Sequence, residues 1–239
     1  MSPYLLAKAH FSKAFKFLSV EDDGRWIRMI STILESPFWD LQFAKSMREA
    51  SAISKAKVAW SLLIADIDLN DSSGATGIDV LKAFPFFPSK IVLSGLKSVE
   101  EGYKAGLVGA KAVFDKSTSM DYGKFRETVA KFAAMGYMLN GRCPNHENII
   151  WALVESSPVT VAEWIEPFPM ERRRWEQLCP SYLGCSPKEA IRIYQALTFI
   201  QLHSWATTEP GECHADLDMG GKILEAISKY PRPTLLRPW

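Results

Sequence analysis

The stretch Trp60-Ser61-Leu62-Leu63-Ile64-Ala65-Asp66-Ile67-Asp68-Leu69-Asn70 decides the fold, because it is an apolar run that ends on acidic residues. Such a run is typical of a strand buried on both faces of a parallel sheet. Open α/β sheets bind ligands at the carboxyl ends of their strands, so Asp66 and Asp68 are candidate site residues. A solvated turn is the alternative interpretation, since Asp and Asn are good turn formers. The remainder of the chain has to decide between the two.

The composition is that of a globular protein with enough residues for two domains. The chain has 239 residues, of which 47% are hydrophobic and 23% are charged, and its net charge of +1 indicates no particular class of partner. The four cysteines form no CxxC pair, which argues against a zinc site and a disulfide framework. No apolar run approaches the length of a transmembrane helix, and the first residues lack the layout of a signal peptide. We therefore expect a cytoplasmic protein without a membrane partner.

Strand candidates alternate with helix candidates through the first half of the chain. Besides 60–65, apolar runs predict strands at 15–20, 38–43, 90–93 and 112–114. Helical spacing predicts helices from 25 to near Pro37 and at 47–58, 78–84, 99–107 and 122–132. Alternation at this spacing predicts a parallel sheet covered by helices. All five strands should then end at one edge of the sheet.

Charged and hydroxyl side chains follow four of these strands. Glu21 and Asp22 follow the first, Asp66 ends the third, Ser94 ends the fourth and Lys116 follows the fifth. Three carboxylates at one edge repel one another unless a cation joins them, and their hard oxygen ligands suit Mg²⁺. A hydroxyl and an ammonium opposite them could hold the oxygens of a phosphoryl group on an aspartate.

Five motifs in a fixed order resemble the receiver domain of two-component response regulators over residues 15–132. They are VEDD at 20–23, LLIADIDL at 62–69, TGIDVL at 76–81, IVLSG at 91–95 and GAKAVFDKS at 109–117. The separations are also similar to the family's layout, with 44 residues from Asp22 to Asp66 and 22 from Ser94 to Lys116. The resemblance implies an α/β, flavodoxin-like (βα)5 domain that acts in signalling and is not an enzyme.

The resemblance also implies a role for each residue at the strand ends. Asp66 would accept a phosphoryl group from a sensor histidine kinase or a phosphotransfer protein. Glu21, Asp22 and Asp66 would hold Mg²⁺, with the backbone carbonyl of Asp68 as a further ligand. Ser94 would bind a phosphoryl oxygen, and Lys116 would pair with the aspartyl phosphate.

Some positions depart from the family pattern. The loop between Asp66 and Gly77 is longer than usual, Val113 stands where a switch aromatic often sits, and Ser117 replaces a proline. A degenerate receiver that is not phosphorylated is therefore an alternative. Strand alternation predicts that Asp68 points to the same side as Asp66, where its charge would add repulsion.

Asp23, next to the first acidic pair, has a simpler interpretation. Asp is a favoured N-cap residue, and Gly24 follows at the start of a predicted helix. We therefore expect Asp23 to cap that helix rather than to bind metal.

The second half is predicted to be all-α. We expect an N-terminal arm or helix at 1–14, the receiver domain at 15–135, a linker at 136–148 and an all-α domain at 149–239. The prolines of this half are expected to divide it into short helices; they are Pro158, Pro167, Pro169, Pro180 and Pro187.

Residues 159–202 resemble the first helix-turn-helix of an AraC-type transcription factor. The resemblance rests on the motif LGCSPKEAI at 183–191. Residues 217–237, which include Pro233 and Arg237, resemble a divergent second helix-turn-helix. This resemblance is weaker than the receiver one. It implies a helix-turn-helix domain that binds promoter DNA.

In that scheme the recognition helix is 170–179, whose candidate DNA-contacting side chains are Glu171, Arg172, Arg173, Arg174 and Gln177. Arg and Gln suit bidentate contacts to base edges, and neighbouring Arg residues suit phosphates. A solvated helix face is the alternative.

The net charge of the second half disfavours DNA binding. Residues 151–239 hold nine Lys and Arg against eleven Asp and Glu, a net charge near −2, whereas most DNA-binding domains are strongly basic. DNA binding would then rely on the local arginine cluster and on a homodimer.

Three functional hypotheses follow. The first is a phosphorylated response regulator that acts as a DNA-binding transcription regulator. The second is an adaptor whose helical half binds a protein partner, with or without phosphorylation. A flavodoxin-like enzyme is disfavoured, because no phosphate-binding Gly-rich loop follows the first strand. A metal site at His203 and His214 is disfavoured too, because their spacing fits no zinc finger.

Overall fold

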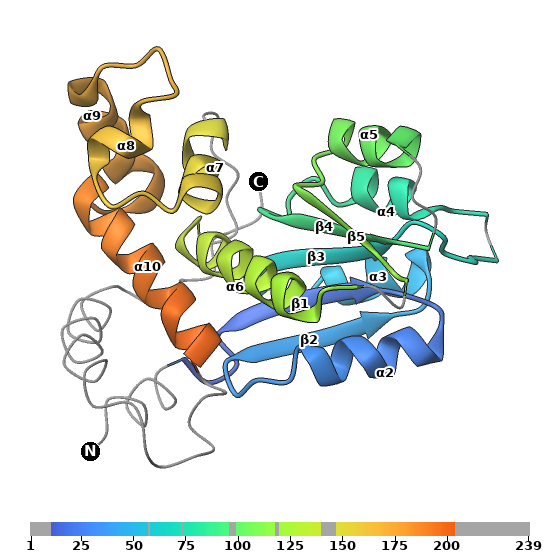
Figure 1. Ribbon diagram of the computed structural model, residues 1–239. Helices are drawn as coiled ribbons and strands as arrows, with labels where there is room; N and C mark the ends of the chain where they lie inside the picture. The colour runs from blue at the N-terminus through green and yellow to red at the C-terminus, as the bar shows by residue number, and fades with distance from the viewer. Residues whose placement is uncertain are drawn as a thin grey trace.

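A five-stranded parallel sheet forms the centre of the first half (Figure 1). The computed structural model describes residues 11–56, 58–72, 74–95, 99–117, 120–139 and 147–203. The strands are β1 (Phe15–Val20), β2 (Trp39–Ala44), β3 (Trp60–Asp66), β4 (Lys90–Ser94) and β5 (Ala112–Asp115). They pair in parallel in the order β2-β1-β3-β4-β5, which is the strand order of flavodoxin-like folds. The predicted fold class of this half is confirmed.

Helices cover both faces of the sheet, as expected of an alternating chain. They are α2 (Gly24–Ile33), α3 (Met47–Ser54), α4 (Gly77–Ala83), α5 (Val99–Leu107) and α6 (Tyr122–Leu139). Leu62 and Ile64 of β3 pack with α2 and α6, whereas Leu63 and Ala65 pack with α3, α4 and α5. Helix α3 is shorter than the predicted range 47–58, since it ends at Ser54.

The opening stretch forms the middle strand of the sheet. All seven residues of β3 are buried, because strands and helices surround them on every side. The turn interpretation of Asp66 is therefore wrong, since Asp66 is the last residue of the strand itself.

The second half is helical wherever the structure describes it. Its helices are α7 (Glu147–Ser156), α8 (Val161–Ile165), α9 (Arg172–Leu183) and α10 (Pro187–His203). Gly184 ends α9 with a positive φ of 74°, which favours glycine at the end of a helix. Pro187 begins α10, where a missing N–H costs nothing.

The expectation that Pro180 separates two helices is wrong. It lies inside α9, although a proline in a helix interior removes one hydrogen bond and crowds the preceding turn. The helix continues because its inner face is buried on both sides of the proline, at Trp175, Cys179 and Leu183. Tertiary packing offsets the local cost.

Helix α6 joins the two halves. It continues to Leu139, and α7 begins at Glu147, so helix covers both ends of the segment 136–148 that was expected to be a linker. One apolar cluster contains residues of β1, β3, α6 and α7 through α10. A buried polar contact reinforces it, since Trp39 Nε1 donates to Gln201 Oε1 at 2.8 Å.

Some expectations lie outside the described residues. Most of the arm at 1–14 and the whole of the second helix-turn-helix copy at 217–237 are among them. Among the helices that are described, none has the length and apolarity needed to cross a membrane.

Candidate functional site

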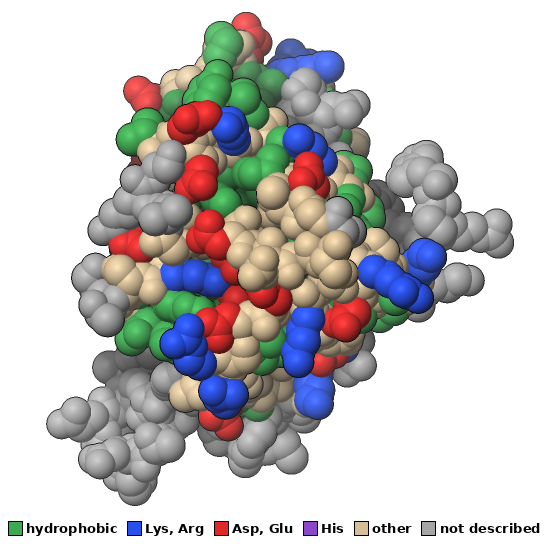
Figure 2. Space-filling model, turned by 90° about the vertical axis from the view of Figure 1, so that its right-hand side faces the viewer, with side chains coloured by type: hydrophobic (Ala, Val, Ile, Leu, Met, Phe, Trp, Pro, Cys, Tyr) green, Lys and Arg blue, Asp and Glu red, His purple; other side chains and the backbone are tan. Residues whose placement is uncertain are grey.

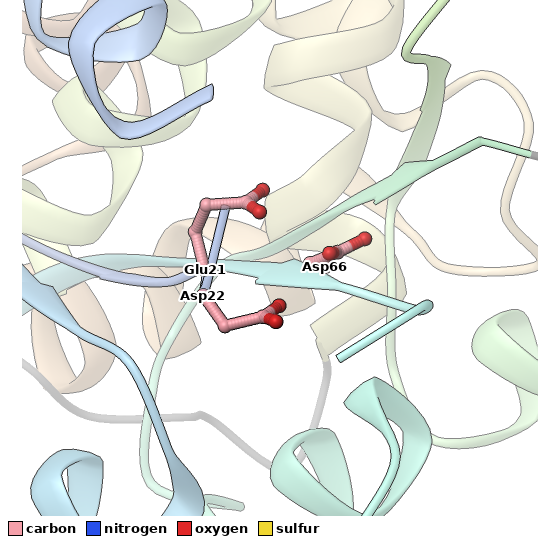
Figure 3. A group of neighbouring side chains, drawn as sticks. All are labelled: Glu21, Asp22 and Asp66. Atoms are coloured by element: carbon pink, nitrogen blue, oxygen red, sulfur yellow. The ribbon is translucent and has the colours of Figure 1, made fainter. Parts of the chain in front are cut away.

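Three carboxylates meet at the carboxyl edge of the sheet. Figure 2 views this edge and shows acidic side chains gathered near the middle of the surface. Figure 3 shows Glu21, Asp22 and Asp66, whose carboxylates extend to the same side. One ligand atom from each lies within 4.8 Å of the others. Glu21 and Asp66 are buried, and Asp22 is half-buried.

The register of the sheet explains why these acids meet. β1 and β3 are neighbours, and Val20 lies opposite Ala65. Glu21, which follows β1 directly, and Asp66, the last residue of β3, therefore lie at the same level. Immediately afterwards Asp23 begins α2, because its carboxylate accepts the Arg25 N–H at 2.8 Å. The prediction that Asp23 is an N-cap is confirmed.

Lys116 supplies the positive charge of the site. Its Nζ lies 2.6 Å from Glu21 Oε2 and 2.7 Å from Asp66 Oδ2, and its side chain is almost fully buried. The ammonium also lies 5.3 Å from the ring centre of Trp26, at cation–π distance. The backbone N–H of Lys116 donates to Ser94 O at 2.8 Å, which fixes the lysine beside the end of β4. The predicted meeting of Lys116 with the acids is thus present in the structure.

The site has more negative than positive charge, since Lys116 faces Glu21, Asp22 and Asp66. Burial raises the pKa of Glu21 to about 7, the hydrogen bond from Lys116 opposes this rise, and repulsion from Asp66 adds to it. One ammonium faces three carboxylates, so a bound cation would be electrostatically favoured.

Asp68 has a partner that the sequence did not indicate. β3 ends at Asp66, so the strand alternation used to orient Asp68 does not apply. Instead Asp68 Oδ2 accepts the Gly95 N–H at 2.7 Å, and the Asp68 N–H donates to Asp66 Oδ1 at 3.1 Å. Asp68 thereby joins the loop after β3 to the loop after β4. Its backbone carbonyl as a metal ligand stays a prediction.

Gly77 allows the loop after β3 to fold back against the site. A Cβ at this position would lie 2.0 Å from Asp66 O, so only glycine fits. Thr76 then begins α4 with a capping box, because its hydroxyl and the Asp79 carboxylate each accept the other's backbone N–H. The quoted TGIDVL motif thus combines a close approach with a helix start.

Ser94 is the last residue of β4, so it lies at the strand ends as predicted, and it is buried. Two other residues near the site, Trp26 and Gly95, were not predicted. Trp26 belongs to the helix predicted from residue 25, and its position just after Glu21–Asp23 places it in the first turn of α2, beside the site. Gly95 could not be found from spacing, because its role depends on the path of the loop.

The residues present fit a divalent cation. Within the described ranges, the group formed by Glu21, Asp22 and Asp66 is the one cluster of metal-ligating side chains. All its donors are carboxylate oxygens, which hard cations such as Mg²⁺ prefer. The carboxylate of Asp66 belongs to this cluster and also lies 2.7 Å from Lys116 Nζ.

The arginine cluster lies on the surface of the helical half. α9 covers 172–183, so the predicted recognition helix at 170–179 overlaps it but is displaced. Glu171, Arg172, Arg173, Arg174 and Gln177 are all exposed. Arg172 Nε pairs with Glu176 Oε1 at 2.8 Å, one turn along the helix. DNA contact by this face stays a prediction, and His214 lies outside the described residues.

No protein-family model matches the sequence, and no curated protein matches it significantly. Solved structures similar to the first half of the chain include receiver domains. A CheY-like receiver domain protein from Methanospirillum hungatei is 21% identical, with 51% of this chain and 95% of that chain covered and a TM-score of 0.44. The chemotaxis response regulator CheY4 of Vibrio cholerae is 22% identical, with 49% and 98% covered and a TM-score of 0.42. The phosphorylated cyanobacterial phytochrome response regulator RcpA is 20% identical, with 44% and 82% covered and a TM-score of 0.38.

Proposed function

We propose that this protein is a two-component response regulator whose Asp66 accepts a phosphoryl group. The observation that carries the proposal is the arrangement around Asp66 at the strand ends. Its carboxylate is buried at the end of β3, is paired with Lys116 at 2.7 Å, and lies in one cluster with Glu21 and Asp22. A nucleophilic carboxylate, a fixed cation and further carboxylates that can hold a metal ion suit transfer to an aspartate.

The transfer starts from a phosphohistidine of a sensor kinase or a phosphotransfer protein. An oxygen of Asp66 forms a bond to phosphorus while the phosphorus–nitrogen bond breaks, and the histidine nitrogen keeps the electron pair. Lys116 neutralises oxygens of the arriving group, and the Ser94 hydroxyl at the end of β4 donates to one of them. The chain itself acts as acceptor and not as an enzyme on a separate substrate.

Glu21, Asp22 and Asp66 are the residues that would hold Mg²⁺. When bound there, the ion neutralises negative charge at the phosphoryl oxygens. Lys116 already spans Glu21 and Asp66, so the protein's own cation orients the acceptor carboxylate before the donor arrives.

Phosphorylation with acetyl phosphate and Mg²⁺ tests the assignment of Asp66. Intact-mass measurement should show one added phosphoryl group in the wild type and none in Asp66→Asn. Asp68→Asn is the matched control, because Asp68 is a nearby carboxylate whose acceptor oxygen for Gly95 the amide retains. Equal incorporation in the wild type and Asp66→Asn would contradict the proposal, and no incorporation in either would favour a degenerate receiver.

For the output, the proposed role is DNA binding by a homodimer through α9. The support is the exposed set of Arg172, Arg173, Arg174 and Gln177 on one helix. Selection from random DNA, followed by a salt titration, tests this role. Sequence enrichment is expected, and Arg173→Ala should weaken binding and reduce the salt slope by about 1.

A protein-binding adaptor is the second candidate, and two observations favour it. The helical half packs directly on the sheet domain, with a shared apolar cluster and a buried hydrogen bond between Trp39 and Gln201. Its net charge near −2 also disfavours a polyanion partner. No sequence enrichment and no salt-dependent affinity in the same DNA experiment would favour the adaptor.

A further inference from the structure

The ring of Trp26 contacts the ammonium of Lys116 in the candidate site. The ammonium has two other contacts, the carboxylates of Glu21 at 2.6 Å and Asp66 at 2.7 Å, and the centre of the Trp26 ring lies 5.3 Å from Nζ. The face of an aromatic ring carries negative charge and attracts an ammonium. Trp26 is thus the uncharged member of the three groups that hold this lysine.

Helix α2 fixes the position of the ring. Trp26 lies in the first turn of α2, and its half-buried side chain packs against the apolar cluster of the core. The cap made by Asp23 fixes the start of the helix. Beyond its other end, Arg126 of α6 donates to Ile33 O and to Glu35 O. A helix anchored at both ends leaves the ring little freedom to move away from Lys116.

The surroundings of Lys116 restrict a side chain that is usually mobile. A lysine has a flexible four-carbon stem and normally extends its ammonium into water. The side chain of Lys116 is only 7% exposed, although it follows the edge strand β5. Its backbone N–H is also fixed, by donation to Ser94 O at 2.8 Å. The remaining freedom of the residue lies in the stem, and the Trp26 ring limits it from one side.

The two carboxylates that hold Lys116 have other roles in the proposed reaction. Asp66 is the proposed phosphoryl acceptor, and Glu21 belongs to the cluster that would hold a divalent cation. When phosphoryl oxygens arrive, the N–H groups of Lys116 must turn from carboxylate oxygens to them. An aromatic face attracts the ammonium without being a strong hydrogen-bond acceptor, so this contact can persist through the exchange.

We infer that Trp26 is a positioning residue for phosphorylation of Asp66. Its ring holds the ammonium of Lys116 beside the Asp66 carboxylate while the lysine exchanges its carboxylate contacts for phosphoryl oxygens. Trp26 acts through Lys116 and does not itself touch the phosphoryl group. The inference rests on the proposed function, because it names a further residue of the same site.

Initial rates of phosphorylation by acetyl phosphate and Mg²⁺, measured on the full chain by intact mass, test this role. Trp26→Leu should react at least about fivefold more slowly than the wild type, because leucine is apolar but offers no aromatic face. Trp26→Phe should stay within about twofold of the wild type, since it keeps such a face. A residue that only fills space would be replaced equally well by either, so equal rates in the two variants would overturn the inference.

Lys111→Met is the matched control for these rates. Lys111 Nζ lies 5.4 Å from the ring centre of Trp151, so this variant breaks a cation–π pair of the same kind. Lys111 precedes β5, at the opposite end of the strand from Lys116. The control should therefore react at the rate of the wild type, and a fivefold loss in it as well would show that the effect does not come from the site.

The NMR signal of the Lys116 ε-methylene group gives a second readout, which needs no phosphorylation. Protons above the face of an aromatic ring resonate upfield, so the signal should be upfield in the wild type and in Trp26→Phe but not in Trp26→Leu. Its absence from Lys116→Gln identifies it. An unshifted signal in the wild type would overturn the inference, because the ring would not lie over the ammonium.

The two readouts separate this inference from the proposed function. No phosphoryl incorporation in the wild type would overturn the proposed function and with it the role of Trp26, even if the upfield signal were present. Normal incorporation in the wild type with an equal rate in Trp26→Leu would overturn the role of Trp26 alone.

Discussion

Glu21 sets the charge state of the candidate site. Its pKa is raised to about 7 by burial, and a carboxylate must be deprotonated to bind a metal. Mg²⁺ affinity should therefore increase with pH up to about 7 and level off above it. Below that value each pH unit should cost up to about tenfold in affinity, since one proton competes with the ion. Calorimetric titration at a series of pH values measures this dependence.

Asp22→Asn is the control for Glu21. It removes a half-buried ligand whose loss should weaken Mg²⁺ binding at every pH while the pH dependence persists. Affinity that is flat across this range in the wild type would contradict the role of Glu21.

Gly77 is the residue whose substitution should damage the site most directly. In Gly77→Ala the new Cβ would lie 2.0 Å from Asp66 O, so the loop and the end of β3 must separate. We expect a loss of about 2 kcal/mol or more in the free energy of unfolding, together with weaker Mg²⁺ binding. Urea unfolding measures the first quantity.

Gly24→Ala makes the same change at the start of α2, where the nearest atom would be the end of the Arg28 side chain at 3.6 Å. This variant should unfold like the wild type. If both variants lost the same stability, crowding at Asp66 would not be the reason.

Asp68 should restrain the loop after β4. Asp68→Ala removes the acceptor of the Gly95 N–H, a contact at the surface, so the amide should exchange with solvent roughly fivefold faster, equivalent to about 1 kcal/mol. Hydrogen exchange followed by NMR measures this rate. Asp68→Asn keeps an acceptor oxygen and should exchange nearly as slowly as the wild type; acceleration in both variants alike would point to the charge and not the hydrogen bond.

At the scale of elements, the contact between α6 and β3 is close enough to require glycine. A Cβ at Gly136 would lie 2.2 Å from Ser61 O, although helix propensity alone favours alanine. We therefore expect Gly136→Ala to lower the free energy of unfolding by about 2 kcal/mol or more. Gly102→Ala on α5, where no atom interferes, should instead raise it slightly, and urea unfolding of both variants compares the two signs. A gain in both would mean that α6 can move away from β3 without cost.

The sequence predicted the elements well where hydrophobic pattern and capping agree. β1 and α5 have the predicted bounds, because apolar alternation or helical spacing stops at each end. The predicted helix at 122–132 stops short of the end of α6 at Leu139, since residues 133–139 are all buried and show no periodic boundary. Pro180 was misjudged because its tolerance depends on Trp175, Cys179 and Leu183 being buried by other helices.

The candidate site was predictable for a related reason. Parallel strands end at one edge, so residues that follow the apolar runs must meet there, as Glu21, Asp66 and Lys116 do. The hydrogen bond between Asp68 and Gly95 could not be predicted, because it depends on two loop paths. Local sequence does not encode the relative position of two loops.

At the scale of the whole molecule, the two halves share one apolar core. Gln201 of α10 is fully buried; its amide donates to Ala130 O of α6 at 3.1 Å and to Leu197 O at 2.9 Å. Its carbonyl accepts the indole N–H of Trp39 in β2. Trp39 and Gln201 are far apart in the sequence, so no local pattern indicated that the halves are joined by a buried polar contact.

This shared core predicts that the described helices and the sheet unfold together. Gln201→Ala leaves the Trp39 indole N–H without its acceptor in a buried place, which should cost about 1 to 3 kcal/mol. The whole loss should appear in one cooperative urea transition, with the same midpoint by far-UV circular dichroism and tryptophan fluorescence. Gln177→Ala, at an exposed position of α9, should leave the midpoint unchanged. Two separate transitions in the wild type, or a loss confined to the helical half, would mean that the halves are independent domains and that α6 belongs to the sheet alone.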